Sequence, residues 1–232
     1  MQSFDIVREI KPKKTFRTSA IISNFDLDVD HLQEHFIGGV ELPDEWQVGL
    51  IVGGSGTGKT TIAKELFPDA YFCGYDYNDD AVIDNMAKSA SVKDIEKTFT
   101  AVGFSSPPSW LKPYAVLSNG EKMRVDLARC ILDDKALIVF DEFTSVVNRE
   151  CAKTTSLAIQ KAIRKSKKQF IAVSCHDDVI EWLMPDWIYD TDQKRFFSQR
   201  GSSTAPQSNL KYTGLTTALK TKCGKSLGSI II

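Results

Sequence analysis

The sequence predicts an α/β fold with a mainly parallel sheet flanked by helices. Short apolar segments alternate with helical patterns through the middle of the chain, which is typical of parallel strands joined by helices. Segment 136–140 is apolar at every position, as expected of a strand covered on both faces. Segment 48–52 is a short apolar strand that leads through a glycine-rich loop into a helix. The composition, 42% hydrophobic and 25% charged over 232 residues, excludes a disordered or repeat-built chain.

The N-terminal part is expected to add an antiparallel β portion. Segments 3–10 and 15–22 are rich in β-branched and aromatic residues, and the Lys-Pro-Lys-Lys run between them indicates a turn. Later elements are expected in this order: strand 48–52, helix 59–67, strand 70–73, helix 91–102, helix 118–132, strand 136–140, helix 149–165, strand 170–174, helix 177–184 and strand 187–189. Ser91 with Asp94, and Ser118 with Glu121, have the spacing of helix capping boxes.

Charge divides the chain near residue 193. Residues 1–193 hold 22 basic and 30 acidic residues, a net charge of −8, whereas residues 194–232 hold seven basic residues and no acidic one. We therefore expect a folded domain at 1–193 and a basic tail at 194–232. The tail includes a linker-like stretch at 198–209. Its remainder is expected to be disordered or the remnant of a second domain, and the alternative is a basic arm for an acidic partner.

Cysteine usage and hydropathy indicate a cytoplasmic protein. The five cysteines lack CxxC spacing and paired histidines, which indicates reduced thiols and implies neither a disulfide framework nor a zinc site. No apolar run approaches the roughly 18 residues of a membrane-spanning helix. The first residues also lack the pattern of a signal peptide. We expect a protein with no membrane segment of its own.

Residues 53–60, Gly-Gly-Ser-Gly-Thr-Gly-Lys-Thr, match the phosphate-loop pattern between a strand and a helix. Glycines let successive backbone N–H groups face the β-phosphate, and Lys59 places a charge near the β- and γ-phosphates. The Thr60 hydroxyl is suited to Mg²⁺. A plain glycine turn would have no need of Lys59 and Thr60. The expected ATP-binding residues are Gly53, Gly54, Ser55, Gly56, Thr57, Gly58, Lys59, Thr60 and Thr61.

Asp141 and Glu142 follow the buried strand 136–140. A carboxylate at the end of a parallel strand beside a phosphate loop is placed to hold Mg²⁺, so Asp141 and Thr60 are the predicted metal residues. Glu142 can polarise the attacking water. The alternative, two acids that only solubilise a strand end, is weakened by the presence of the phosphate loop.

Segment 117–121, Leu-Ser-Asn-Gly-Glu, with Arg124 and Ala128-Arg129 after it, closely resembles the signature motif of ATP-binding cassette (ABC) ATPases. The family motif is Leu-Ser-Gly-Gly-Gln followed by Arg and then Ala-Arg. The resemblance implies that Ser118 and Gly120 contact the γ-phosphate bound by a second copy, so that two sites form only in a head-to-tail, ATP-dependent homodimer. Taken alone, the segment could be an ordinary helix cap.

The resemblance continues in three further segments. Segment 143–148 is similar to the Pro-Thr-Ser-Ala-Leu-Asp run that forms the family's D-loop, and His176 resembles the switch histidine that contacts the γ-phosphate. His176 therefore joins Lys59 and Glu142 as an expected catalytic residue. The family also places an aromatic ring on adenine, for which Phe25 is the first choice, with Phe36 and Phe16 as rivals.

The chain departs from the family pattern in ways that affect the expected role. Asn119 and Glu121 replace Gly and Gln in the signature, and Asn148 replaces the usual D-loop Asp. No Gln occurs between Gln47 and Gln160, so the family's Q-loop Gln has no counterpart, and Asp76 or Asn78 is only a guess at a substitute. The interval between Lys59 and Ser118 is short, which predicts a shortened helical subdomain. The amino-acid sequence of segment 105–129 most resembles that of ABC-type ATPase modules in bacterial and phage mobile-element proteins. Some of those modules are fused to an acetyltransferase-like domain.

These observations predict a soluble ABC-type ATPase of the P-loop NTPase class that hydrolyses Mg-ATP between two copies of the chain. One alternative is the ATP-binding subunit of an ABC transporter, which requires a membrane partner. Another is a nucleotide-gated clamp on DNA or another macromolecule, recognisable by DNA-stimulated hydrolysis. A small-molecule kinase would leave segment 118–129 and His176 unexplained.

Overall fold

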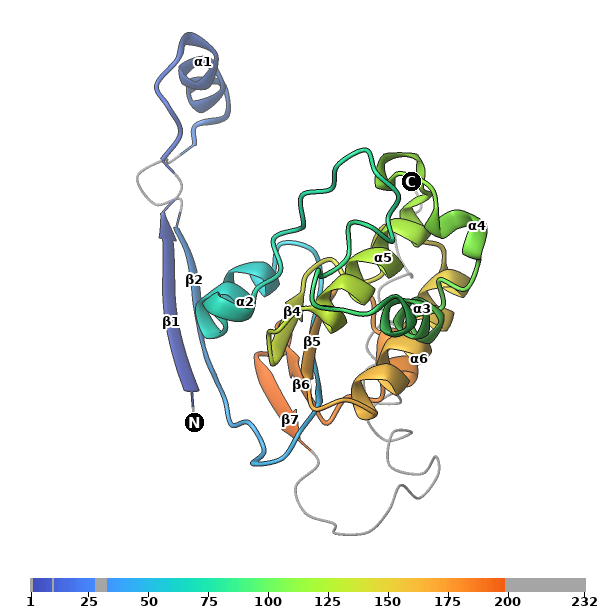
Figure 1. Ribbon diagram of the computed structural model, residues 1–232. Coiled ribbons are helices and arrows are strands. Elements are labelled where there is room, and N and C mark those ends of the chain that lie inside the picture. Colours follow the sequence, from blue (N-terminus) through green and yellow to red (C-terminus); the bar gives the residue numbers. More distant parts are fainter. Residues whose placement is uncertain (1, 10, 28–32, 199–232) are drawn as a thin grey trace, which may run out of the picture.

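The computed structural model describes residues 2–9, 11–27 and 33–198. Its strands form a five-stranded sheet flanked by helices and a separate two-stranded sheet beside it (Figure 1). The strands are β1 (Gln2–Glu9), β2 (Gln33–Val40), β3 (Val48–Val52), β4 (Leu137–Phe140), β5 (Gln169–Ser174), β6 (Trp187–Asp190) and β7 (Arg195–Ser198). The helices are α1 (Phe16–Phe25), α2 (Lys59–Leu66), α3 (Val92–Ala101), α4 (Pro107–Trp110), α5 (Asn119–Leu132), α6 (Arg149–Arg164) and α7 (Val179–Leu183), with 3-10 turns η2 (Pro68–Ala70) and η3 (Tyr114–Val116).

The larger sheet has the strand order β4-β5-β3-β6-β7. Strands β4, β5, β3 and β6 are parallel, and β7 pairs antiparallel with β6. The predicted α/β class is confirmed. Because the parallel strands all end at one edge, the loops that follow β3, β4, β5 and β6 lie together there.

Side chains of β3 alternate between the two faces of the sheet. Val48, Leu50 and Val52 belong to the core under α3, α5, α6 and α7, whereas Ile51 belongs to the core shared with α2 and β1. All five residues of β3 are buried. This double burial holds rigidly the strand from which the glycine loop leaves.

Most of the predicted elements are present within a few residues of their expected ends. The helix at 91–102 is α3, with Ser91 as its N-cap and Gly103 at φ +84° after it. The helix at 118–132 is α5, and its capping box between Ser118 and Glu121 is formed on both sides. Capping patterns and continuous apolar strands act over a few residues, which is why they could be recognised locally.

The predicted N-terminal hairpin is only half correct. Strand β1 is present, but segment 15–22 belongs to helix α1, and the partner of β1 is β2. Thr15 caps α1 by a capping box with Thr18, and Thr18 also donates to the Lys13 carbonyl. These local hydrogen bonds outweigh the β preference of Thr18, Ile21 and Ile22.

At the larger sheet, one prediction is wrong and one strand was not predicted. Segment 70–73 is not a strand: Ala70 is the last residue of η2, and within the segment only Tyr71 forms a β-bridge, to Val139. Strand β7 was not expected, and it lies beyond residue 193, where the basic tail was expected to begin. Arg195, the first residue of β7, pairs in register with Asp190, so the sheet includes the start of that segment. The rest of the predicted tail, from 199 to 232, lies outside the described residues.

The expectations about the cysteines and about membrane-spanning helices can be compared with the described residues. Cys73, Cys130, Cys151 and Cys175 are free there, and Cys223 lies outside the described residues. In the same ranges, no helix combines the length and the apolar character that crossing a membrane requires.

Candidate nucleotide-binding site

The glycine loop between β3 and α2 has the backbone that its sequence requires. Gly53, Gly56 and Gly58 have φ values of +154°, +81° and +85°, a region that side-chain-bearing residues rarely adopt. Lys59 begins α2 and is buried, and its Nζ donates to the Gly54 carbonyl oxygen at 2.6 Å. The Lys59 side chain therefore folds back onto the backbone of its own loop, and the loop leads directly into the N-terminus of α2.

Asp141 lies directly beside the glycine loop. Thr60 Oγ1 donates to Asp141 Oδ2 at 2.7 Å, and the Glu142 backbone N–H donates to Asp141 Oδ1 at 2.8 Å. The hydroxyl and the carboxylate together offer two oxygen ligands, and Mg²⁺ prefers oxygen ligands. These residues therefore fit the predicted metal ion. Two segments 81 residues apart in sequence thus meet at one point.

Tyr71 also contacts this carboxylate, which the sequence did not predict. Its hydroxyl donates to Asp141 Oδ2, the oxygen that accepts from Thr60. Burial, with the hydrogen bond to Asp141, raises the pKa of the Tyr71 hydroxyl, so this group stays protonated and remains a donor at neutral pH. Of the two suggested Q-loop substitutes, Asn78 bonds to Asp80 and Asn85, and the backbone carbonyl of Asp76 accepts from Arg129.

Glu142 sits on a strained turn after β4. Its φ is +51° and that of Thr144 is +68°, both in the left-handed region. Phe143 between them is fully buried, and its N–H donates to the Val173 carbonyl at 2.9 Å, which anchors the turn against β5. Glu142 is exposed and lines a cleft of about 380 Å³ beside Asp141. Strain of this kind is often kept at functional sites.

His176 follows β5, which lies between β3 and β4 in the sheet. It is half-buried, and its backbone N–H donates to Ser174 Oγ at 3.2 Å. The strand order thus places His176 at the same sheet edge as Lys59 and Asp141. Its contact with the γ-phosphate, which the resemblance implies, stays a prediction.

Ser118 and Gly120 lie at the start of α5. The Ser118 hydroxyl donates to Glu121 Oε2 at 2.8 Å, and hydrogen bonds from the Ser118 backbone and side chain lower the pKa of Glu121. A β-carbon added to Gly120 would lie 3.0 Å from Cys151 Sγ, so α5 approaches the start of α6 closely there. Within the described ranges, no hydrogen bond joins these two residues to the glycine loop of the same chain.

Asn148 has a local role at the start of α6. Its Oδ1 accepts from the Cys151 backbone N–H at 2.8 Å, which makes it the N-cap. Asp and Asn are equally good N-caps. The replacement of the usual D-loop Asp therefore leaves this helix start intact.

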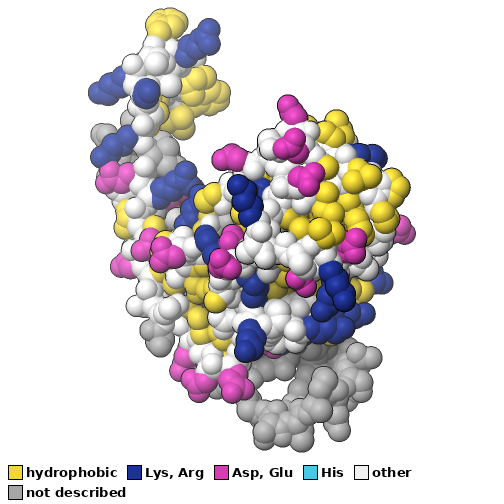
Figure 2. Space-filling model, in the orientation of Figure 1, with side chains coloured by type: hydrophobic (Ala, Val, Ile, Leu, Met, Phe, Trp, Pro, Cys, Tyr) yellow, Lys and Arg dark blue, Asp and Glu magenta, His cyan; other side chains and the backbone are white. Residues whose placement is uncertain are grey.

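The first choice for the adenine-stacking ring is not at the loop. Phe25 lies on α1, at the end of β1 and β2 away from the larger sheet (Figure 1), and 69% of it is exposed. Other large apolar side chains of this helix are exposed as well, and hydrophobic surface is visible on it in Figure 2. The rival Phe36, on β2, lies against the loop, because a β-carbon on Gly58 would fall 2.3 Å from Phe36 Cε1. The other rival, Phe16, is 90% exposed on α1.

The turn between β6 and β7 supplies two more contacts that were missed. Asp192 Oδ2 accepts from the Gly54 N–H at 2.9 Å, and the hydroxyls of Thr191 and Thr57 are 2.6 Å apart. Both residues follow a parallel strand, which was the available signal. That β6 lies beside β3 could not be read from the sequence, and this pairing brings the turn to the loop.

Sequence comparisons find partial matches to ATP-binding proteins. No family model matches the chain. The β-(1→2)glucan export ATP-binding/permease protein NdvA of Rhizobium meliloti is 34% identical over 102 residues, which is 44% of this chain and 17% of NdvA. The thiamine import ATP-binding protein ThiQ of Histophilus somni is 32% identical over 83 residues, 36% of this chain and 38% of ThiQ. The chain thus matches well under half the length of these curated relatives.

Solved structures show the same fold. The dimeric structure of MJ0796, a bacterial ABC transporter cassette, matches with a TM-score of 0.55 at 16% identity, over 73% of this chain and 94% of the cassette. A bacterial Atm1-family ABC exporter with ATP bound matches with a TM-score of 0.54 at 20% identity, over 78% of this chain and 37% of the exporter chain. The partial sequence matches agree with the resemblance to ABC-type ATPases, and the solved structures show that the chain has the fold of an ABC ATPase cassette.

Proposed function

We propose that this chain binds and hydrolyses Mg-ATP at an interface between two copies arranged head to tail. The observation that carries the proposal is the 2.7 Å contact between Thr60 and Asp141 beside the buried Lys59. It joins a phosphate-binding loop to a carboxylate at a sheet edge, as phosphoryl-transfer sites require. Related support comes from MJ0796, whose post-hydrolysis state bound to ADP and Pi shares the fold with a TM-score of 0.55.

The residues of the site divide the work of hydrolysis among them. The glycine loop and Lys59 would hold the β- and γ-phosphates, and Glu142 would accept a hydrogen bond from water and hold its oxygen in line with the γ-phosphorus. The water oxygen then bonds to that phosphorus as the bond to the β–γ bridging oxygen breaks, which releases ADP and phosphate. Mg²⁺ held by Thr60 and Asp141 would neutralise charge on the phosphates. Catalysis is then positioning and charge neutralisation.

The second copy is needed to complete the site. Ser118 and Gly120 lie at the start of α5, whose N-terminus favours an anion, and in its own chain Gly120 lies against the start of α6. A head-to-tail partner would bring its own Ser118 and Gly120 to the γ-phosphate. The solved MJ0796 cassette, which shares the fold of this chain, is also dimeric.

Glu142→Gln tests the proposal directly. The variant should bind ATP but hydrolyse it about 10²- to 10⁴-fold more slowly, the usual contribution of a group that activates water. With hydrolysis blocked, Mg-ATP should shift it to a dimer in size-exclusion chromatography with light scattering. Lys59→Ala is the matched control and should bind no ATP and stay monomeric. Normal hydrolysis by Glu142→Gln would remove Glu142 from this role.

A transporter subunit is the second candidate, because the named relatives NdvA and ThiQ are export and import ATP-binding proteins. This role uses the same hydrolytic site but requires a membrane partner. Expression of the tagged chain in its native cell, followed by membrane fractionation and identification of bound proteins, separates the candidates. A stoichiometric membrane-protein partner would support the transporter role, and recovery of the chain alone in the soluble fraction would support the first proposal.

A further inference from the structure

Tyr71 is held against the candidate magnesium site from several directions. Its backbone forms a parallel bridge with Val139, and the Phe72 N–H donates to the Val139 carbonyl at 2.8 Å. Lys64 Nζ lies 4.8 Å from the centre of the Tyr71 ring. The hydroxyl at the end of this fixed ring donates to Asp141 Oδ2. Asp141 is only two residues beyond Val139, so the bridge and the side-chain hydrogen bond reinforce each other.

The two hydroxyl donors have one geometric consequence. Thr60 and Tyr71 both donate to Oδ2, and the backbone N–H of Glu142 donates to Oδ1. Donors on both oxygens fix the rotation of the carboxylate about its Cβ–Cγ bond. Groups that orient a metal-binding carboxylate in this way typically change metal affinity by 10- to 100-fold when they are removed.

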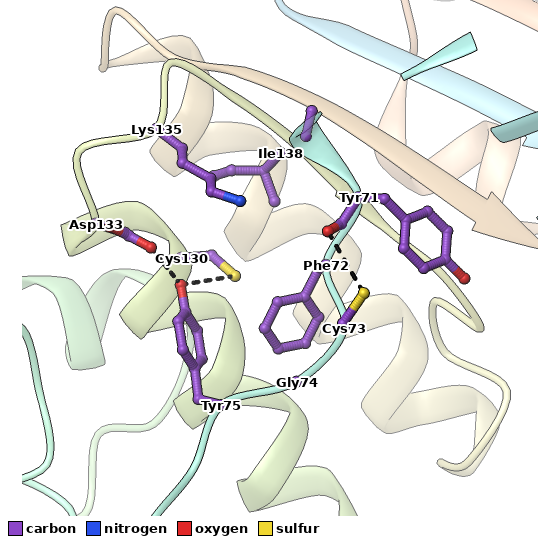
Figure 3. A pocket seen from close by; sticks show the side chains of 10 residues that line it. Tyr71, Phe72, Cys73, Gly74, Tyr75, Cys130, Asp133, Lys135 and Ile138 are labelled. Carbon is purple, nitrogen blue, oxygen red and sulfur yellow. Dashed lines mark hydrogen bonds between the residues drawn. The ribbon is translucent and has the colours of Figure 1, made fainter. Parts of the chain in front are cut away.

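The chain that follows Tyr71 is tied to α5 by tyrosines. Figure 3 shows Tyr75 directed towards Cys130 and Asp133 while Tyr71 points away from them, along the opposite side of the segment. Tyr75 donates to Asp133 Oδ2 at 2.9 Å, and Tyr77 donates to Asp126 Oδ1 at 2.8 Å. Asp126 and Asp133 are near the middle and at the end of α5.

Arg129, also on α5, joins the same contacts. Its guanidinium lies over the rings of Tyr75 and Tyr77, 4.2 and 4.9 Å from their centres, and it donates to the Asp76 carbonyl at 3.1 Å. The Tyr77 ring is stacked on Tyr114 with centres 3.8 Å apart, and Tyr114 also donates to Asp126. Segment 71–77 is therefore clamped on α5 at one end and on Asp141 at the other.

We propose that Tyr71 is a positioning residue of the magnesium site and that segment 71–77 connects Asp141 mechanically to α5, the helix that begins after Ser118. The inference rests on the proposed function. It assigns to tyrosine hydroxyls and Arg129 a connection between the metal carboxylate and the surface that would meet the second copy. A change in the position of Asp141 on metal binding would pass through Tyr71 to the backbone at Tyr75 and Tyr77, and from there to α5.

Binding of Mn²⁺, measured by electron paramagnetic resonance on the full chain with ADP present, tests the metal step. Tyr71→Phe removes only the hydroxyl and should weaken Mn²⁺ binding about tenfold. Its affinity for ADP in EDTA should stay unchanged, because the phosphate loop is intact. Tyr75→Phe is the matched control: it removes the same group from the same segment, but the lost partners are Asp133 and Cys130, so Mn²⁺ binding should equal that of the wild type.

Hydrogen–deuterium exchange tests the connection to α5. Addition of Mn²⁺ and ADP should slow exchange of α5 amides in the wild type. Tyr77→Phe should reduce this protection while binding Mn²⁺ normally, since its hydroxyl contacts α5 and not Asp141. Circular dichroism and melting temperature confirm that each variant is folded.

The outcomes separate the two proposals. Wild-type Mn²⁺ affinity in Tyr71→Phe would overturn the role of Tyr71, and unchanged α5 protection in Tyr77→Phe would overturn the connection. If the wild-type chain itself binds neither ADP nor Mn²⁺, the proposed function fails instead.

Discussion

The Phe36 ring covers Gly58 at the start of α2, whereas Phe25 is exposed on a helix that projects from the molecule. Stacking of a base on an aromatic ring contributes about 1–3 kcal/mol. We therefore expect Phe36→Leu to weaken ATP binding about tenfold, as measured by titration calorimetry, and Phe25→Leu to leave it unchanged. Leucine keeps an apolar side chain in the partly buried position of Phe36, which protects the fold. The opposite pattern would return the adenine contact to Phe25.

Two residues of the site, Tyr71 and Asp192, could not be identified from sequence motifs. Tyr71 and Asp192 reach the site by one hydrogen bond each, to Asp141 and to Gly54. Neither belongs to a motif with a characteristic spacing. Each could be identified only from the strand or segment that lies beside it in space.

At the scale of elements, α5 has its own stabilising device at the N-terminus. Hydrogen bonds from the Ser118 backbone and side chain lower the pKa of Glu121 below its unfolded value of about 4.3. A lowered pKa adds stability at pH values above the unfolded pKa, and this stability is lost as the pH falls through the folded pKa. The first turn of α5 is thus stabilised by an ionised Glu121 at neutral pH.

Glu121→Gln checks this pH dependence. We expect the wild type to melt at a higher temperature than the variant at pH 6–7, and the difference to shrink as the pH falls towards 3. Circular dichroism melts across that range measure it. Ser118→Ala removes the partner instead, so adding Glu121→Gln to it should cost little further stability. A difference between wild type and Glu121→Gln that is constant with pH would contradict the assignment.

For the molecule as a whole, the charge of residues 1–193 bears on which partners the chain can bind. Residues 1–193 carry a net charge of −8, and non-specific DNA binding depends on cationic contacts to phosphates. We expect a chain ending at residue 198, which keeps β7, to show an ATPase rate that is unchanged by duplex DNA at low salt. The full chain is the comparison, because its last 34 residues add five basic ones. DNA stimulation of the shortened chain, falling steeply with salt, would instead favour the DNA clamp.

The elements that depend on local sequence patterns were predicted well, and those that depend on distant partners were not. Strands β3 and β4 and helices α3 and α5 were expected at nearly their observed positions, because apolar runs and capping residues act within a few residues. The β-branched residues of segment 15–22 favour a strand, but the capping box at Thr15 starts helix α1 there instead. The partner of β1 lies more than 20 residues away, and nothing local specifies that pairing.

The glycine loop, the carboxylates Asp141 and Glu142 and the helix that starts after Ser118 could all be predicted from the sequence, because each depends on residues that are neighbours along the chain. The tertiary structure decided which of them meet. Only the order β4-β5-β3-β6 brings Asp141 to Thr60, places His176 at the same edge and adds Tyr71, Thr191 and Asp192 to the site. The physical reason is that strand order is set by packing over the whole sheet, and short-range patterns carry little information about it.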